Sequence, residues 1–316
     1  MNDKILIVGG AGYVGGYLTD CLVSDGYCVT VYDNLLFEDR YMKEVDFICG
    51  DVRDKRKLRP LLKKYDVVVW LAALVGDGAC AVNAPLTRKI NVECVRWFVD
   101  NFEGKIIFPS TCSVYGVNND LISEDAESNP LSLYAATKLE AEQYILGNAD
   151  RPAVFRLGTL YGLGDLHSRI RLDLVVNILS MRAAKGEPLT VFGGKQWRPL
   201  LHVRDAAEAI AYSIKNDLSG LYNLSHDNYQ IKDLAFEISK IVPSTQIQQV
   251  DMKYEDLRNY RVDNSKILAT GWKPKYSLEY GIQQIYQIIS DERLKNIDDK
   301  VYSNAKHMKG LASEES

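Results

Sequence analysis

The sequence lacks several features that mark specialised classes of protein. No apolar run approaches the ~20 residues of a membrane-spanning helix. The N-terminus passes from MNDK directly into ILIVGGAG, without the apolar core and cleavage site of a signal peptide. The formal net charge is -4 and no long basic run is present, which disfavours nucleic acid as a partner. We therefore expect a cytoplasmic protein that acts on small molecules, with neither a membrane nor a nucleic acid as partner.

Cysteine and histidine are scarce and do not form groups. The six cysteines all lie within the first 112 residues and form no C-x-x-C pair. We expect reduced and mostly buried thiols. The four histidines are scattered and no carboxylate cluster accompanies them, so the sequence predicts no metal site.

What the chain does contain is a regular alternation of strand and helix patterns. The strand-length runs are KILIVGG, CVTVYD, DFICGDV, DVVVWLAA, KIIFPST and PAVFRLGT, and most are separated by segments with helical spacing. This alternation predicts an α/β fold, a doubly wound parallel sheet with helices on both faces.

The pattern changes after about Tyr161. We expect a long helix from Leu172 to Lys185, a strand at PLTVFGG, a short helix near Asp205 and a mixed C-terminal third. These elements predict a smaller α+β lobe. The polar C-terminal stretch NAKHMKGLASEES is expected to fray.

A glycine-rich turn between the first strand and the first helix predicts a dinucleotide site. The segment GGAGYVGG has G-x-x-G-x-x-G spacing, which lets backbone N–H groups approach a pyrophosphate at the positive end of a helix. Asp33 follows about twenty residues later, where a carboxylate binds ribose hydroxyls and repels the extra phosphate of NADP, so NAD is favoured. Asp51 and Val52 would meet the adenine, and LAA would line the nicotinamide side. The expected cofactor residues are Gly9, Gly12, Tyr13, Val14, Gly15, Asp33, Asn34, Asp51, Val52, Leu71, Ala72 and Ala73, joined by Tyr134 and Lys138.

A second motif predicts proton-transfer chemistry. Tyr134 and Lys138 in YAATK fall at i and i+4, on the same face of a helix. A phenol with a pKa of ~10 is a poor base at neutral pH, and a nearby ammonium together with the positively charged nicotinamide favours the phenolate. Thr111, at the end of the KIIFPST strand, can hold the substrate hydroxyl. We predict Thr111, Tyr134 and Lys138 as catalytic residues.

These motifs, in this order, make the chain resemble the extended short-chain dehydrogenase/reductase family, and within it the NAD-dependent epimerase/dehydratases of nucleotide-linked sugars. The resemblance also includes VYDNL, GDVRD, STCSVYG, FRLGTLYG, RPLLHVRDAAEA, LYNLS and GWKPKYSLEYGI, and covers nearly the whole chain. It implies a Rossmann domain for NAD over residues 1–160, with a returning segment near 202–225. Residues 161–201 and 226–316 would form the nucleotide-sugar lobe. It also implies a homodimer through helices that flank the catalytic tyrosine.

The same resemblance implies a set of substrate contacts. Arg198 matches the arginine that contacts the substrate diphosphate, although the family more often has Asp where this chain has Pro199. Arg258 is a second candidate for the diphosphate, and Asn177 matches an asparagine near the nucleotide. The expected substrate residues are Val75, Gly76, Asp77, Ser113, Thr159, Asn177, Arg198 and Arg258.

Four further polar residues of this lobe receive other expectations. Arg169 and Arg171 are expected on a solvated charged face, with a place at the rim of the site as the alternative. His202 lies between apolar residues and is expected to pack at the lobe boundary, and Asp205 is expected to cap the following helix.

Departures from the family pattern narrow the reaction. The 4,6-dehydratases carry an acid–base pair after the catalytic threonine, where this chain has Cys112 and Ser113. The 3,5-epimerases of GDP-sugars use a cysteine two residues after the catalytic hydroxyl, whereas Cys112 follows Thr111 directly. What remains is oxidation at C4 of a nucleotide-diphosphate sugar. We predict a 4-epimerase of polysaccharide biosynthesis; a 4-dehydrogenase that releases the keto sugar, for example of a GDP-linked heptose, stays open. A dehydratase and a non-catalytic NAD sensor are less favoured.

Overall fold

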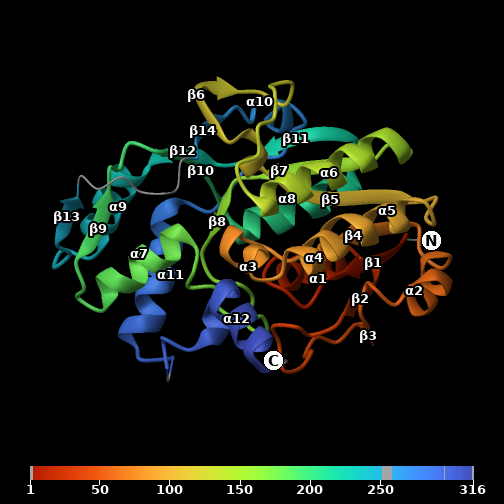
Figure 1. The fold of residues 1–316 in the computed structure, drawn as a ribbon, viewed down its shortest axis with the longest axis horizontal. Coiled ribbons are helices and arrows are strands. Elements are labelled where there is room, and N and C mark those ends of the chain that lie inside the picture. The colour runs from red at the N-terminus through yellow and green to blue at the C-terminus, as the bar shows by residue number, and fades with distance from the viewer. Residues whose placement is uncertain (1–2, 251–257, 295, 315–316) are drawn as a thin grey trace.

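The computed structural model describes residues 3–250, 258–294 and 296–314 and confirms the predicted α/β class. Seven parallel strands form the main sheet, in the order β11-β7-β5-β4-β1-β2-β3 (Figure 1). Its strands are β1 (Lys4–Val8), β2 (Cys28–Asp33), β3 (Asp46–Cys49), β4 (Val67–Trp70), β5 (Lys105–Thr111), β7 (Ala153–Leu157) and β11 (Gly220–Leu224). The helices that follow these strands are α1 (Gly15–Ser24), α2 (Lys55–Leu62), α3 (Asp77–Val82), α4 (Ala84–Arg88), η1 (Lys89–Glu93), α5 (Cys94–Val99), η2 (Cys112–Tyr115), α6 (Leu133–Asn148) and α8 (Val203–Lys215).

Alternation along the strands explains why helices cover both faces of this sheet. Ile5 and Ile7 of β1 belong to one apolar cluster, which includes residues of α1 and α8. Leu6 and Val8 point to the other face, into a cluster with residues of α2, α5 and α6. Because successive side chains of a strand point to opposite faces, an uninterrupted apolar strand such as β1 must be covered on both sides.

The strand order also fixes where a ligand binds. β1 pairs with β4 on one side and with β2 on the other, so the order along the sheet reverses at β1. In open parallel sheets the crevice for ligands lies outside the carboxyl ends of the strands at such a switch point. The loops after β1, β2, β4 and β5 meet there.

A smaller lobe lies beside the carboxyl edge of the sheet, on the left in Figure 1. It is built on a core with Val176, Leu200, Leu234 and Ile282. Residues 203–224, which form α8 and β11, return to the main sheet. The lobe and the adjoining short sheets comprise β6 (Val117–Ile122), β8 (Thr159–Tyr161), α7 (Val175–Ala184), β9 (Leu189–Phe192), β10 (Trp197–His202), β12 (Asp227–Gln230), α9 (Ile231–Ile241), β13 (Ile247–Val250), β14 (Asn259–Val262), α10 (Ser265–Leu268), α11 (Leu278–Ser290), η3 (Lys300–Tyr302) and α12 (Asn304–Glu314).

The helix expected from Leu172 to Lys185 begins later than predicted, at Val175. The C-terminal segment holds the preceding residues outside the helix. The N–H of Leu172 donates to the Tyr302 carbonyl at 3.0 Å, and the Asp173 carboxylate accepts from the Asn304 N–H at 2.8 Å. These partners lie about 130 residues away in sequence, so helical spacing alone misplaced the boundary.

The expectation that the C-terminus frays is wrong as far as the structure describes it. Residues Asn304–Glu314 form α12, which packs against α3 (Figure 1). Met308 is 4% exposed and lies in an apolar cluster with Leu74 and Cys80. The His307 ring donates to the Leu36 carbonyl at 2.8 Å. One apolar side chain and a few hydrogen bonds therefore anchor a segment whose composition is mostly polar.

Two local expectations are also corrected. All six cysteines are free, as expected, but Cys28 and Cys49 are exposed and only Cys80, Cys94 and Cys112 are buried. Asp205 does not cap α8, because the cap is His202, whose Nδ1 accepts the Arg204 N–H. The Asp205 carboxylate instead accepts the N–H groups of residues 275 and 276, which ties α8 to the chain before α11. His202 itself is fully buried, as expected of a packing residue.

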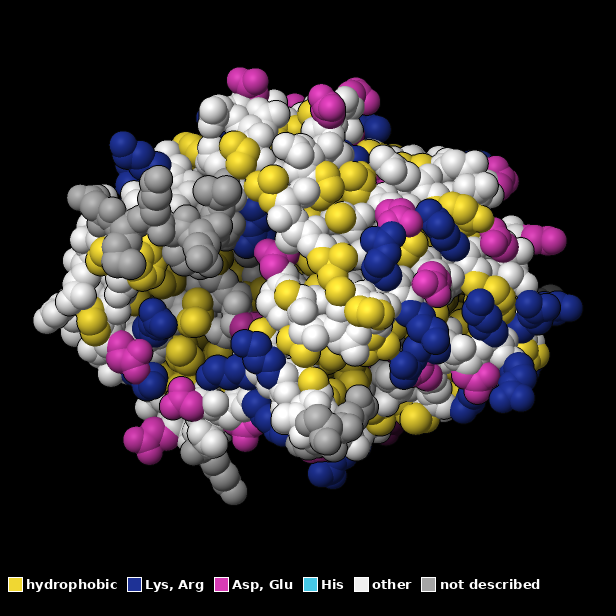
Figure 2. Space-filling view, in the orientation of Figure 1, with side chains coloured by type: hydrophobic (Ala, Val, Ile, Leu, Met, Phe, Trp, Pro, Cys, Tyr) yellow, Lys and Arg dark blue, Asp and Glu magenta, His cyan; other side chains and the backbone are white. Residues whose placement is uncertain are grey.

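The surface carries both signs of charge on the face that Figure 2 shows. On the side of α5 and α6, Arg88 and Arg96 both pair with Glu140. Within the ranges that the structure describes, no helix combines the length and the apolar character needed to cross a bilayer.

Candidate active site

The loop between β1 and α1 has the shape that a pyrophosphate requires. Gly9 has a φ of +84°, and a Cβ there would collide with the backbone of Ala72. A Cβ on Gly15 would collide with the backbone of Gly10. Gly12 faces more open space and lines the cavity. Glycine is therefore needed for the turn itself, and the start of α1 presents backbone N–H groups to an anion.

Asp33 ends β2 beside this loop. Its carboxylate accepts the N–H groups of Ala11 at 3.0 Å and Leu35 at 2.8 Å, so it links the glycine loop to the loop after β2. Burial raises its pKa, and the backbone hydrogen bonds oppose that shift. A carboxylate fixed in this place can accept hydrogen bonds from ribose hydroxyls.

Asp51 follows β3 at the other end of the cavity. Hydrogen bonds from the Arg53 side chain lower its pKa, and its backbone carbonyl accepts from the Tyr32 hydroxyl at 2.8 Å. The Arg53 side chain therefore already binds this carboxylate. Contact between Asp51 and the adenine stays a prediction.

One cavity at the carboxyl edge of the sheet gathers most of the predicted site residues. Those that line it are Gly9, Gly12, Tyr13, Val14, Gly15, Asp33, Asn34, Asp51, Val52, Leu71, Ala72, Ala73, Val75, Gly76, Thr111, Ser113, Tyr134, Lys138 and Thr159. The cofactor and substrate candidates therefore share one continuous space. Asp77, Asn177, Arg198 and Arg258 are not among its lining residues.

The predicted catalytic residues come from two elements. Thr111 is the last residue of β5, and its hydroxyl accepts the Ser113 N–H at 3.1 Å. Tyr134 and Lys138 lie in the first two turns of α6, whose N-terminus is capped by the Ser132 hydroxyl. The Lys138 ammonium lies 3.8 Å from the centre of the Phe108 ring. Strand end and helix start thus place a hydroxyl, a phenol and an amine around the same cavity.

Burial disfavours the charged forms of both ionisable catalytic groups. It raises the pKa of the Tyr134 phenol, while a hydrogen bond with Thr111 and the charge of Arg171 lower it. It lowers the pKa of Lys138 to about 7, and the charge of Glu142, one turn further along α6, opposes the shift. Ionisation of the phenol therefore depends on nearby positive charge, and Arg171 supplies part of it.

Asn177 has a different position from the one expected. Its side chain is fully buried, its oxygen accepts the Gly162 N–H at 2.9 Å, and its nitrogen donates to the carbonyls of Gly162 and Arg171. Because these bonds occupy its amide, Asn177 orients the chain between β8 and α7 and does not reach the cavity.

Arg198 and Arg258 lie behind one wall of the cavity. The Arg198 guanidinium donates to the Arg258 carbonyl at 2.6 Å, and Arg258 pairs with Asp77 at 3.0 Å. Arg198 also lies 5.8 Å from the ring centre of Tyr260, a lining residue whose hydroxyl is 3.2 Å from the Ser113 hydroxyl. Contact between either arginine and a diphosphate stays a prediction.

Several lining residues were not predicted as parts of the site, and three of them carry polar side chains from the segments after β8 and at the start of α12. Arg169 and Arg171 were expected on a solvated face, but both line the cavity, and the Arg171 side chain is only 11% exposed. Asn304 reaches the cavity from the start of α12. No sequence signal pointed to Asn304, because the segment that carries it is polar and distant from every motif.

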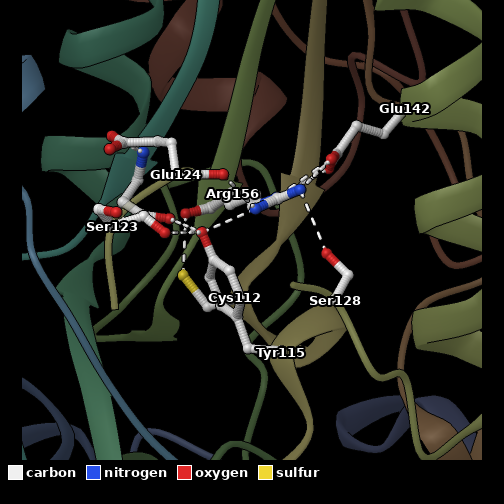
Figure 3. A network of polar contacts seen from close by, with 8 residues as sticks. Cys112, Tyr115, Ser123, Glu124, Ser128, Glu142 and Arg156 are labelled. Carbon is white, nitrogen blue, oxygen red and sulfur yellow. Dashed lines mark hydrogen bonds and ion pairs between the residues drawn. The ribbon is translucent and has the colours of Figure 1, made fainter. Parts of the chain in front are cut away.

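A buried polar network joins Cys112 and Tyr115, which follow β5, to Arg156 and Glu142 (Figure 3). Arg156 of β7 forms an ion pair with Glu142 of α6 at 2.6 Å, and donates to the Tyr115 hydroxyl at 2.7 Å. The Cys112 thiol donates to the Arg156 carbonyl at 3.0 Å. The network connects the end of β5, β7 and α6, so it fixes the catalytic strand against the catalytic helix.

Comparison with known proteins agrees with this geometry. Residues 5–225 match the model of the NAD dependent epimerase/dehydratase family, and the chain belongs to that family. It is an NAD-dependent enzyme of the extended short-chain dehydrogenase/reductase type. The prediction of NAD as cofactor is confirmed.

Individual relatives act on nucleotide sugars. The chain is 28% identical to the UDP-N-acetyl-alpha-D-glucosaminuronate decarboxylase of Bacillus cytotoxicus, over 91% of this chain and 98% of that protein. It is 29% identical to a putative UDP-glucose 4-epimerase of Methanocaldococcus jannaschii, over 89% of this chain and 96% of that protein. The structure of the Thermus thermophilus UDP-glucose 4-epimerase in complex with NAD matches with a TM-score of 0.75 and 25% identity, over 90% of this chain and 98% of that one.

Proposed function

We propose that this protein is a nucleotide-sugar 4-epimerase. The observation that carries the proposal is that Thr111, Tyr134 and Lys138 line the same cavity as the glycine loop and Asp33. Relatives that are UDP-glucose 4-epimerases support the same reaction class. NAD, when bound against the glycine loop, accepts a hydride from C4 of the sugar and returns it.

The protein's own residues move the proton. Thr111 holds the C4 hydroxyl, and Tyr134 removes its proton when the surrounding positive charge favours the phenolate. Lys138 contributes to that charge from the next turn of α6. Once the keto sugar has turned its opposite face toward the hydride donor, the Tyr134 hydroxyl returns the proton to the C4 oxygen, and C4 is inverted.

The C-terminal segment favours an epimerase over a dehydrogenase that releases its product. The Asn304 side chain donates to the Val75 carbonyl at 2.9 Å, beside the expected sugar loop. His307 donates to the Leu36 carbonyl, close to the cofactor end. One helix therefore contacts the loop that contains Val75 and the loop that contains Leu36. These contacts favour retention of cofactor and ketone until the sugar has turned over.

A 3,5-epimerase reaction that uses a cysteine loses support from the position of Cys112. Its thiol is buried and donates to the Arg156 carbonyl, so it cannot act on the sugar. The 4-dehydrogenase stays the second candidate, because it would use the same catalytic residues and differs only in the fate of the ketone.

Several finer statements belong to the proposal. By analogy with the relatives, we propose a UDP-linked substrate. We further propose a role in bacterial polysaccharide biosynthesis, a cytoplasmic location, and a homodimer through the helices that flank Tyr134. The assignment of 1–160 to NAD and of the lobe to the nucleotide sugar is part of the same proposal.

A two-stage experiment tests the function. UDP-, GDP-, CDP- and dTDP-sugars are first screened for a rise in thermal stability, since a ligand well above its dissociation constant stabilises the fold. The best ligand is then incubated with the enzyme, and the C4 configuration of the recovered sugar is read by NMR. A C4 epimer is expected. A 4-keto sugar without epimer, with accumulation of reduced nicotinamide, would favour the dehydrogenase; no turnover of any sugar nucleotide would refute both.

A further inference from the structure

The Arg171 side chain lines the cavity, and its guanidinium has no ligand assigned to it in the proposed reaction. Its Nε pairs with the Asp173 carboxylate at 2.9 Å. The terminal amino groups of this guanidinium have no hydrogen-bond partner among the residues that the structure describes. The side chain lines the cavity and is 11% exposed, so a ligand bound in the cavity can reach this guanidinium.

A second arginine makes this environment more positive. Arg169 lines the same wall, and the charge of Arg171 adds to the burial that lowers the pKa of Arg169 to about 10. The Arg169 guanidinium is already occupied, by the Val301 carbonyl at 2.6 Å and by the Asn304 side chain. Arg171 is therefore the member of the pair with donors left for a ligand.

The position of Arg171 relative to the catalytic residues indicates which part of a ligand it meets. Its charge reaches the Tyr134 phenol and the Tyr13 phenol, and lowers the pKa of both. The charges of Arg198 and Arg258 instead act on Tyr260, at another wall. The cavity thus has positive charge at two separate places, and Arg171 is the arginine beside the proton-transferring group.

We propose that Arg171 binds a carboxylate on the sugar itself, so that the substrate is a nucleotide-linked uronic acid. This inference rests on the proposed C4 chemistry and narrows its substrate class. A planar guanidinium with two vacant amino groups suits the two oxygens of a carboxylate. Asp173 and the start of α12 hold the guanidinium in place, since Asp173 also accepts the Asn304 N–H. The Thr159 hydroxyl, on the same cavity, is a second donor for the carboxylate.

Binding measurements on matched sugar pairs test the assignment without requiring turnover. Dissociation constants are measured by calorimetry for UDP-glucuronic acid and UDP-glucose, and for GDP-mannuronic acid and GDP-mannose, with NAD present. The wild-type protein is expected to bind the acid of at least one pair about tenfold or more tightly than the neutral sugar. Arg171→Gln should abolish that preference and leave the affinity for the neutral sugar within about threefold.

One further variant and one control separate the possible sources of a change in affinity. Arg171→Lys keeps the positive charge but loses the planar pair of amino groups. It should retain only part of the preference for the acid over the neutral sugar. Arg182→Gln, on the same lobe in α7 and outside the cavity lining, should behave as wild type. NAD affinity and the thermal unfolding midpoint are measured for each variant and should stay close to wild type.

Specific results would overturn the inference. Equal affinity for acid and neutral sugar in the wild type, or no binding of either pair, would contradict it. If Arg171→Gln lost the same affinity for the acid and for the neutral sugar, Arg171 would lie at the diphosphate that both share. If it lost affinity for NAD alone, Arg171 would lie at the cofactor pyrophosphate. If the epimerase proposal alone were wrong, the protein would bind the acid tightly but would form no C4 epimer from it.

Discussion

At the scale of single residues, the chemistry depends on a phenol that burial keeps neutral until positive charge surrounds it. Tyr134→Phe removes one hydroxyl and keeps the ring that packs near Leu74 and Cys80. We expect the fold and NAD affinity to survive while kcat falls by orders of magnitude, because the variant loses the hydroxyl that is proposed to accept the proton. Turnover within tenfold of wild type would show that another group carries the proton.

In the proposed mechanism, Lys138 influences the pH range in which the Tyr134 phenol acts as a base. Burial lowers the pKa of Lys138 to about 7, so its ammonium is lost as the pH rises through neutrality. Lys138→Ala removes the positive charge altogether, and the phenol then ionises only at higher pH. We expect a large fall in kcat and a pH optimum displaced upward. A pH–rate profile with the wild-type optimum would contradict this role.

Asp33 is the residue that we predict to select NAD over NADP. Its carboxylate is fixed by two backbone N–H groups at the end of β2, where a 2′-phosphate would meet a negative charge. We expect the wild-type protein to bind NAD at least about tenfold more tightly than NADP, and Asp33→Ala to narrow that difference. Fluorescence titration with the two reduced cofactors measures it, and equal wild-type affinities would refute the assignment.

At the scale of elements, the ion pair between β7 and α6 holds the catalytic helix in register (Figure 3). Glu142 and Arg156 are 1% and 5% exposed, so breaking the pair leaves a buried, unbalanced guanidinium. We expect Glu142→Gln to lower the free energy of unfolding by about 3–5 kcal/mol. Glu140→Gln, which breaks the more exposed pairs with Arg88 and Arg96, should cost about 1 kcal/mol or less. Urea denaturation compares the two, and equal losses would contradict the account.

The elements also show what could be predicted from sequence and what could not. The strands from β1 to β7 carry their own apolar runs, and the glycine turn and the Tyr134–Lys138 spacing are local patterns, so both could be found from sequence. The start of α7 could not, because residues that follow it by about 130 positions hold Asp173 outside the helix. α12 was missed since Met308 anchors a polar segment through contacts made only in the folded chain.

The same distinction applies to the cavity. Arg171 was expected on a solvated face because charged side chains are seldom buried, although Ile170 and Leu172 flank it in the sequence. In the structure Asp173, Tyr13 and the C-terminal segment surround it. Burial of a charged residue depends on which distant elements meet there, and sequence spacing does not contain that information.

At the scale of the whole molecule, the proposed function requires that C4 of a nucleotide sugar be oxidised and reduced again within one cavity, without release of the intermediate. The main sheet supplies the cofactor wall, the lobe supplies Arg171, and α12 spans the loops at both ends. The proposed epimerase reaction therefore requires that the same hydride be retained through both half-reactions.

The most direct measurement is to supply the best-stabilising sugar nucleotide with deuterium at C4 and to analyse the products by NMR and mass spectrometry. The account predicts both C4 epimers, each with deuterium still at C4. An epimer that has lost the label would show exchange with solvent and a different reaction. A labelled cofactor accompanied by a 4-keto sugar, with no epimer, would contradict the central claim.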